Sequence, residues 1–120
     1  MRLLIVEDEW IIAYDLRQFL ESLGHTVHDI TDNAEDAVKL TEKFLPDTIF
    51  MDIKLKGDKT GLEAADVIYK KFKTQVIFCT AFTDEDTRNE AKLVHPIAYI
   101  SKPYSQRYIE SILKGVNRIN

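Results

Sequence analysis

Asp52 combines a residue type and a position that together point to chemistry. This carboxylate directly follows the apolar run Thr48-Ile49-Phe50-Met51. Burying an unpartnered carboxylate costs several kcal/mol, so a buried strand has no structural use for one at its end. Other apolar runs of the chain are also followed by polar residues, namely Glu7-Asp8, Thr80 and Lys102. Three acids, a hydroxyl and an ammonium are the functional groups of a metal-assisted phosphoryl-transfer site.

The elements that must position these residues follow from two alternating periodicities. Short apolar runs have the length and composition of buried strands. They cover residues 3–6, 27–30, 48–51, 76–79 and 97–100. Apolar residues at helical spacing follow each run and predict five helices. The expected helices cover roughly residues 12–23, 34–45, 62–72, 84–93 and 108–116.

Several of the expected helices have recognisable ends. Asn33 is a typical N-cap for the second helix, and Pro46 would stop it. Gly24 stands where the C-terminal cap of the first helix belongs, and Ser105 would open the fifth. The fourth helix is heavily charged and only weakly amphipathic.

A strand–helix unit repeated five times predicts an α/β fold with a single doubly wound, five-stranded parallel sheet and helices on both faces. The sequence contains no linker, repeat or low-complexity tract, so residues 1–120 are expected to form one domain. In a parallel sheet the carboxyl ends of all strands lie on one edge, where ligands bind. Residues 7, 8, 52, 80 and 102 are therefore expected to meet there.

Composition excludes several classes of function. The 16 basic and 20 acidic residues give a net charge of −4 and leave no basic footprint for direct nucleic-acid binding. No apolar stretch approaches the roughly 20 residues that a membrane span requires. The single cysteine, Cys79, lies inside an apolar run and is expected to be a small core residue. Together these features predict a cytoplasmic protein without membrane contact.

Four sequence segments in fixed order carry a resemblance to a known family. They are Val6-Glu7-Asp8-Glu9, Pro46-Asp47 leading into Met51-Asp52-Ile53, Thr80-Ala81, and Tyr99-Ile100-Ser101-Lys102-Pro103. From residue 2 to about residue 117, the chain resembles a two-component response-regulator receiver domain of the chemotaxis-regulator type. The resemblance implies a flavodoxin-like sheet with the strand order 2-1-3-4-5.

The resemblance assigns the acids to a phosphorylation site. Asp52 resembles the phospho-acceptor, a carboxylate nucleophile that takes a phosphoryl group from a phosphohistidine. Glu7 and Asp8 resemble the metal-binding acids of a Mg²⁺ site, because crowded carboxylates need a cation among them. By resemblance, Asp8 and Asp52 bind the ion directly, the backbone carbonyl of Lys54 supplies a further oxygen, and Glu7 acts through water.

The resemblance also assigns roles around the phosphoryl group. Lys102 is similar to the lysine that contacts a phosphoryl oxygen, and the Lys102–Pro103 bond is expected to be cis. By resemblance, Thr80 and the backbone of Ala81 are expected to belong to the same site. Thr80 and Tyr99 resemble a switch pair in which the hydroxyl binds the phosphoryl group and the tyrosine turns inward.

Two positions depart from the family pattern. The family often has proline four residues after the acceptor, where this chain has Lys56, and glycine is common before the fifth strand, where this chain has His95-Pro96. These substitutions leave open the conformation of the loop after the acceptor and the exit of the fourth helix. The three histidines, His25, His28 and His95, match no metal-binding spacing and are expected to be surface or strand residues.

The resemblance implies a phosphorylation-operated signalling switch that presents a changed face of its fourth helix, fifth strand and fifth helix. Its expected partners are a sensor histidine kinase or a phosphotransfer protein and a downstream protein of unknown identity. It would not be an enzyme beyond assisting its own aspartyl phosphorylation and dephosphorylation. The alternative is a phosphorylation-independent interaction module, although such degenerate receivers usually lack an acid, the lysine or the acceptor. A flavodoxin-like cofactor enzyme would need phosphate-cradling loops, which are absent here.

Overall fold

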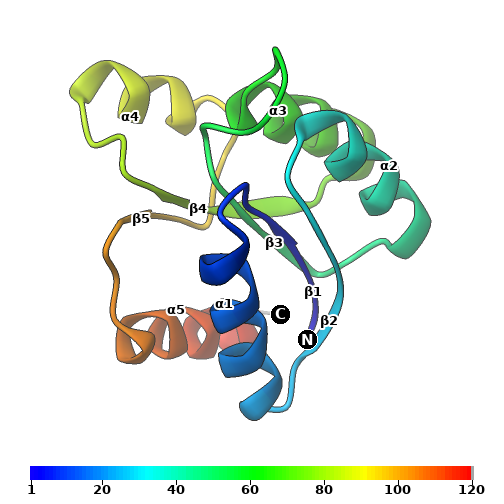
Figure 1. The fold of residues 1–120 in the computed structure, drawn as a ribbon, viewed down its shortest axis with the longest axis vertical. Helices are drawn as coiled ribbons and strands as arrows, with labels where there is room; N and C mark the ends of the chain where they lie inside the picture. Colours follow the sequence, from blue (N-terminus) through cyan, green and yellow to red (C-terminus); the bar gives the residue numbers. More distant parts are fainter. Residues whose placement is uncertain (120) are drawn as a thin grey trace.

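The computed structural model describes residues 1–119, with side chains described to residue 116. Strands and helices alternate along the whole of this range (Figure 1). The strands are β1 (Arg2–Val6), β2 (Thr26–Thr31), β3 (Thr48–Met51), β4 (Gln75–Thr80) and β5 (Ala98–Ser101). The helices are α1 (Trp10–Ser22), α2 (Ala34–Phe44), α3 (Gly61–Phe72), α4 (Glu85–Lys92) and α5 (Gln106–Ile119).

The five strands form one sheet in the order β2-β1-β3-β4-β5, and every neighbouring pair is parallel. This confirms the predicted fold class and strand order. In the register, Met51 at the end of β3 lies opposite Val6 at the end of β1. Strand β4 continues two residues past Phe78, the partner of Met51, and its last residue, Thr80, lies opposite Ser101 at the end of β5. The residues that follow these strand ends therefore reach a common edge, as the sequence predicted.

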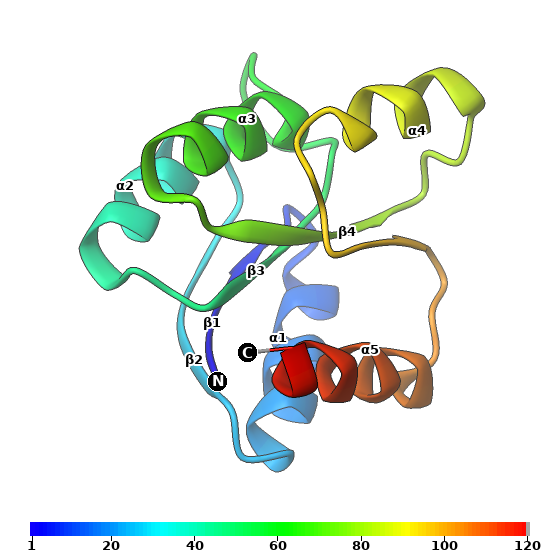
Figure 2. The ribbon, with the colours of Figure 1, turned by 180° about the vertical axis from the view of Figure 1, so that it is seen from behind.

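Helices cover both faces of the sheet. Figures 1 and 2 show α2, α3 and α4 on one side, and α1 and α5 on the other. Successive side chains of a strand point to opposite faces. Within β3, Ile49 and Met51 accordingly join the core beneath α2 and α3, whereas Phe50 joins the core beneath α1 and α5. Because β3 is covered on both sides, its apolar run is continuous rather than alternating.

Local sequence signals set several helix ends where they were expected. The Asn33 side chain accepts a hydrogen bond from the Asp36 N–H at 2.8 Å, which confirms it as the N-cap of α2. Gly24 follows α1 with a left-handed φ of 93°, a conformation that glycine adopts without steric cost. At the start of α3, Thr60 and Glu63 form a reciprocal capping box.

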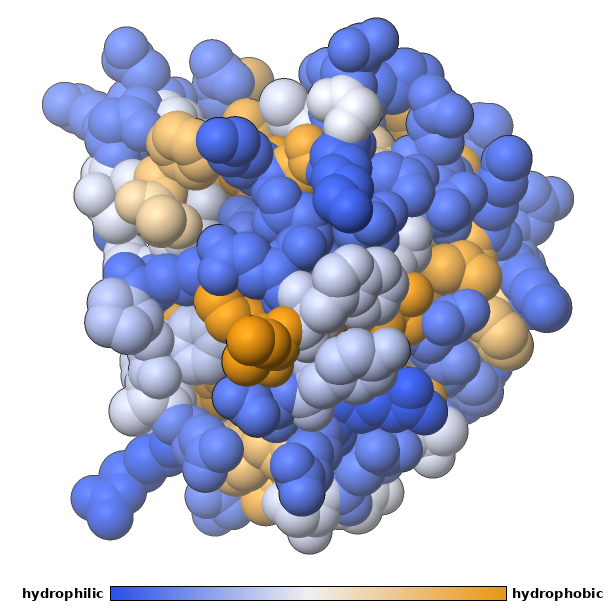
Figure 3. All heavy atoms as spheres, viewed as in Figure 1, coloured by the Kyte–Doolittle hydropathy of each residue, from blue (hydrophilic) through white to orange (hydrophobic). Residues whose placement is uncertain are grey.

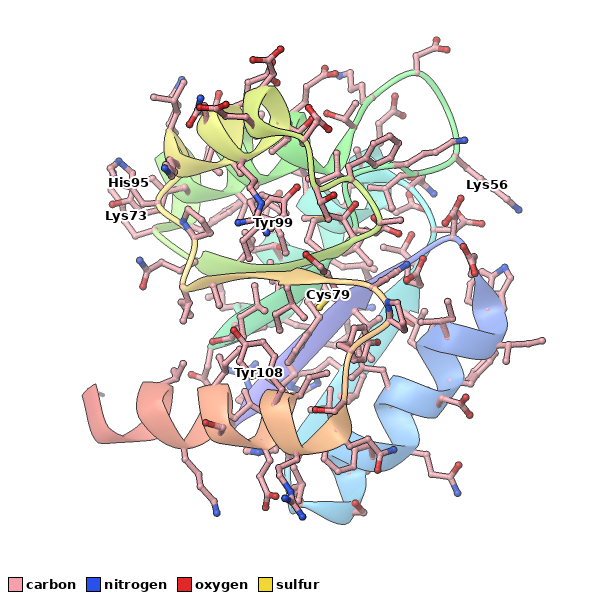
Figure 4. All side chains as sticks on the ribbon, turned by 90° about the vertical axis from the view of Figure 1, so that its left-hand side faces the viewer. Lys56, Lys73, Cys79, His95, Tyr99 and Tyr108 are labelled. Atoms are coloured by element: carbon pink, nitrogen blue, oxygen red, sulfur yellow. The ribbon has the colours of Figure 1, made fainter. Side chains whose placement is uncertain are left out.

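The structure defines the two loops that depart from the family pattern. The Lys56 N–H donates to the Asp32 carbonyl at 3.0 Å, and its ammonium lies 3.4 Å from the Asp32 carboxylate. These contacts attach the loop after β3 to the loop after β2. His95 adopts a left-handed φ of 52°, a conformation that favours glycine, and the centre of its ring lies 5.0 Å from that of Tyr69. Figure 4 shows Lys56 and His95 at distant corners of the molecule.

The surface carries few large apolar side chains. Figure 3 shows hydrophobic and intermediate residues gathered over α1, surrounded by hydrophilic ones. The exposed large hydrophobic residues of α1 are Trp10, Ile11 and Tyr14, with Ile11 80% exposed. Among the described residues, no helix is both long and apolar enough to cross a bilayer.

Candidate functional site

Asp52 lies at the sheet edge, immediately after β3, and is only 7% exposed. Its N–H still donates to the Val6 carbonyl at 2.9 Å, so the sheet holds its backbone. One carboxylate oxygen, Oδ1, accepts from the Ile53 N–H at 2.7 Å. The other, Oδ2, accepts from the Lys102 ammonium at 2.7 Å. The predicted acceptor is therefore buried and oriented through both of its oxygens, and its charge is compensated.

Glu7 and Asp8 follow β1 and meet Asp52 at the same edge. One carboxylate oxygen from each of the three acids lies within 4.8 Å of the others. Glu7 is buried, whereas Asp8 is half-buried. Burial raises the pKa of Glu7 to about 7; the Lys102 contact counteracts part of this rise, and the charge of Asp52 adds to it.

Lys102 follows β5 and joins two of the acids. Its ammonium contacts the carboxylates of both Glu7 and Asp52, and its side chain is 12% exposed. Burial lowers the pKa of Lys102, but the two carboxylates outweigh burial and raise the pKa above its ordinary value. The lysine N–H donates to the Thr80 carbonyl at 2.9 Å, and the Lys102–Pro103 peptide is cis, as expected.

The donor set of the edge fits a hard divalent cation. One ammonium cannot neutralise three ionised carboxylates, and within the described part of the chain Asp8 forms no ion pair with lysine or arginine. Mg²⁺ prefers oxygen ligands and binds one or two carboxylates while keeping several waters. Asp8 and Asp52 can supply such carboxylates, with Glu7 beside them. Lys54 lies two residues past Asp52 with its side chain exposed.

Thr80 ends β4 and is fully buried. Its hydroxyl oxygen accepts from the Phe82 N–H at 3.2 Å. The next residue, Ala81, is exposed and lines a cavity of about 560 Å³ between α1 and α5, which Lys102 also lines. The structure thus brings Thr80, Ala81 and Lys102 to the same edge as the acids.

Tyr99 of β5 lies on the other face of the sheet from Cys79, beneath α4 (Figure 4). It is half-buried, and its hydroxyl donates to the carbonyl of Phe82. Burial raises the pKa of this tyrosine. Phe82 is therefore bound through its N–H by Thr80 and through its carbonyl by Tyr99. Thr80 and Tyr99, the predicted switch pair, form no direct hydrogen bond with each other. Both are hydrogen-bonded to the backbone of Phe82, which connects them.

Arg88 on α4 is a site neighbour that sequence reasoning missed. Its guanidinium lies 5.0 Å from the centre of the Tyr99 ring, and one of its nitrogens is 3.4 Å from the Ser101 hydroxyl. The α4 sequence, EDTRNEAK, is polar or charged at every position but one, so nothing in it distinguishes this arginine from a solvent-exposed one. Only the packing of α4 against β5 reveals the contact.

Two other residues that were considered from the sequence, Cys79 and His28, serve the fold and not the cluster of acids. Cys79 is buried, and burial raises its pKa to about 12, so it remains an unreactive thiol, in agreement with its prediction as a core residue. His28 is a strand residue stacked on Phe44, 4.7 Å away. Within the described residues, the one cluster able to hold a metal contains no histidine.

Comparisons with known proteins identify the relatives of this chain. A model of the response regulator receiver domain matches residues 3–114. The phyllosphere-induced regulator PhyR of Methylorubrum extorquens is 34% identical over 112 residues, which cover 92% of this chain and 41% of PhyR. The transcriptional regulatory protein PdtaR of Mycobacterium tuberculosis is 34% identical over 104 residues, covering 87% of this chain and 50% of PdtaR. The chain thus spans half or less of the length of these relatives.

Solved structures share the fold closely. The signal receiver domain of a modulated diguanylate cyclase from Desulfovibrio desulfuricans superposes with a TM-score of 0.89 at 35% identity, covering 96% of this chain and 91% of that one. The response regulator domain of Thermotoga maritima CheB superposes with a TM-score of 0.85 at 26% identity, covering 98% of this chain and 96% of that one.

Proposed function

This chain belongs to the response regulator receiver domain family, and we propose that residues 1–120 form one receiver domain that accepts a phosphoryl group on Asp52. Members of this family are signalling domains of two-component systems. The observation that carries the proposal is the environment of Asp52. Its buried carboxylate has an oxygen within 4.8 Å of oxygens from two other acids and accepts a hydrogen bond from an ammonium at 2.7 Å. Such a cluster of buried, interacting charges is typical of a functional site.

The proposed reaction is transfer from a phosphohistidine to a carboxylate. An oxygen of Asp52 forms a bond to phosphorus while the phosphorus–nitrogen bond breaks, and the electron pair leaves on the imidazole of the donor. The product is an acyl phosphate. The Ile53 N–H holds the carboxylate in position from one side, and Lys102 offers positive charge to the incoming phosphoryl oxygens from the other.

Glu7, Asp8 and Asp52, with the backbone carbonyl of Lys54, would hold the Mg²⁺ ion. When bound, the ion supplies positive charge that offsets the crowded carboxylates and the phosphoryl oxygens. Thr80 and the backbone N–H of Ala81 would donate hydrogen bonds to the remaining phosphoryl oxygens.

The proposed output depends on the link through Phe82. In the structure the Thr80 hydroxyl accepts the Phe82 N–H, and Tyr99 donates to the Phe82 carbonyl. A phosphoryl oxygen that recruits the Thr80 hydroxyl would move this oxygen, and Phe82 and Tyr99 would adjust together. The population of conformations at α4, β5 and α5 would then shift, and a downstream protein would read that face. A sensor histidine kinase or a phosphotransfer protein would supply the phosphoryl group.

Intact-mass measurement tests the proposal. The protein is incubated with acetyl phosphate or phosphoramidate and Mg²⁺, and its mass is followed. We expect one added phosphoryl group in the wild type and in Asp58→Asn, which changes an exposed acid of the same loop. We expect no added group in Asp52→Asn. An unmodified wild-type protein would contradict the proposal and favour a phosphorylation-independent interaction module.

A further inference from the structure

Gly61 is the first residue of α3, and its backbone packs directly against the backbone of Asp52. It is buried, and its N–H donates to the Ile53 carbonyl at 2.7 Å. A Cβ atom at this position would overlap the carbonyl oxygen of Asp52 and lie 2.9 Å from its carbonyl carbon. It would also approach Cγ of Met51 at 3.0 Å. Since neighbours this close cannot share space with a side chain, only glycine allows the helix to start here.

Gly61 is distinguished from the three other glycines by this close approach. Gly24 and Gly57 have left-handed φ values, and a Cβ on either would meet no atom within 4 Å. Gly115 likewise has open space around it. Gly61 has no left-handed φ, so the reason for glycine there is space and not backbone conformation.

The contact fixes the peptide that carries the acceptor. The Asp52 N–H is bound by Val6 of β1, and the Ile53 carbonyl is bound by Gly61 of α3. Between these two attachments, the Ile53 N–H donates to Oδ1 of Asp52. The orientation of the carboxylate therefore depends on the orientation of this peptide. The first turn of α3, which contains Gly61, is itself held by the capping box of Thr60 and Glu63.

We propose that Gly61 is a positioning residue for phosphoryl transfer: the start of α3 presses on the Asp52–Ile53 peptide and sets the direction of the Asp52 carboxylate. This inference rests on the proposed phosphorylation of Asp52. Adding a side chain would separate α3 from the peptide and turn the nucleophile away from its line of attack. Displacements on the order of 1 Å in reacting groups reduce rates by roughly 100-fold.

The test compares Gly61→Ala with two controls. Gly115→Ala makes the same substitution where no atom is displaced, and Ile68→Val removes a methyl group from the buried face of the same helix. Rate constants for phosphorylation by acetyl phosphate are measured at saturating Mg²⁺, at a temperature where circular dichroism shows every variant folded. NMR follows the Ile53 amide, which reports its bond to Asp52.

We expect Gly61→Ala to react at least tenfold more slowly, with a shifted Ile53 amide, and both controls to react within twofold of the wild type. A Gly61→Ala rate within twofold of the wild type overturns the inference. So does an equal loss in Ile68→Val, because general destabilisation would then explain both.

A second variant covers the case in which Gly61→Ala does not fold. Thr60→Ala removes the side-chain half of the capping box and loosens the first turn of α3 without adding atoms near Asp52. We expect it to react about threefold more slowly with a displaced Ile53 amide, in line with a cap that fixes one turn. An unchanged rate and amide in Thr60→Ala overturn the inference. A wild-type protein that does not react at all overturns the proposed function itself, before any variant is compared.

Discussion

Replacing Lys102 by methionine should destabilise the metal-free protein strongly and in a pH-dependent manner. The substitution keeps an unbranched side chain but removes the ammonium that contacts Glu7 and Asp52, whose side chains are 5% and 8% exposed. Breaking a buried ion pair by removing one partner costs about 3–5 kcal/mol, because a desolvated charge is left uncompensated. We expect a loss of this size in the free energy of unfolding at pH 8.

The pH dependence follows from Glu7. In the wild type its pKa is raised from 4.5 to about 7, so the folded state binds this proton more tightly than the unfolded state does. The wild-type free energy of unfolding therefore decreases as pH rises from about 4.5 through 7, because Glu7 must ionise in the folded state. The total decrease from this group is about 3 kcal/mol. Without Lys102, which lowers this pKa, the pKa rises further. At pH 5 Glu7 is protonated in both proteins, so the penalty of the substitution should be clearly smaller than at pH 8.

Urea denaturation in EDTA measures this effect as a change in midpoint at constant slope. The matched control is Lys56→Met, which breaks an ion pair with Asp32 on a lysine that is 63% exposed. Exposed pairs contribute at most about 1 kcal/mol, so this control should change little at either pH. An equal loss for Lys102→Met at pH 5 and pH 8, or a loss no larger than in the control, would refute the electrostatic reasoning.

Three further predictions concern the metal, the switch and the phosphorylated state. Trp10 lies two residues past Asp8, so its fluorescence should change saturably as Mg²⁺ is added. Asp8→Asn should weaken Mg²⁺ binding at least tenfold, and identical titration curves for this variant and the wild type would exclude Asp8 as a ligand. Thr80→Ala should still accept a phosphoryl group but show smaller NMR shifts around α4 and α5 on phosphorylation; full-sized shifts would show that the threonine does not couple the site to that face. Phe82, which is 43% exposed, and Lys54 should shield the acyl phosphate from water. Phe82→Ala and Lys54→Ala should therefore each speed phosphate release several-fold. Unchanged release in both variants would show that other residues set the lifetime of the phosphorylated protein. A tenfold change in lifetime corresponds to about 1.4 kcal/mol of barrier, which one side chain can supply.

The sequence alone was sufficient to predict the layout of the sheet edge. Four polar residues or pairs follow apolar runs, and parallel strands must bring their carboxyl ends to one side. Asp52, Glu7, Asp8, Thr80 and Lys102 could therefore be grouped without any distance, and the structure brings them together. The strand order, by contrast, came from the resemblance, because strand composition does not determine which strands are neighbours.

Only the tertiary structure decided how the grouped residues contact one another. Lys102 is 50 residues from Asp52 and 95 from Glu7 in sequence. Its bridging of both acids depends on how its side chain reaches from the end of β5, past β4, to the ends of β3 and β1. The contact of Arg88 with Tyr99 depends on how α4 packs over β5. The need for glycine at position 61 depends on the distance between α3 and the end of β3. Periodicity identifies which face of an element is buried, but separations of a few ångströms between elements arise from the packing of the whole core and leave no local pattern in the chain.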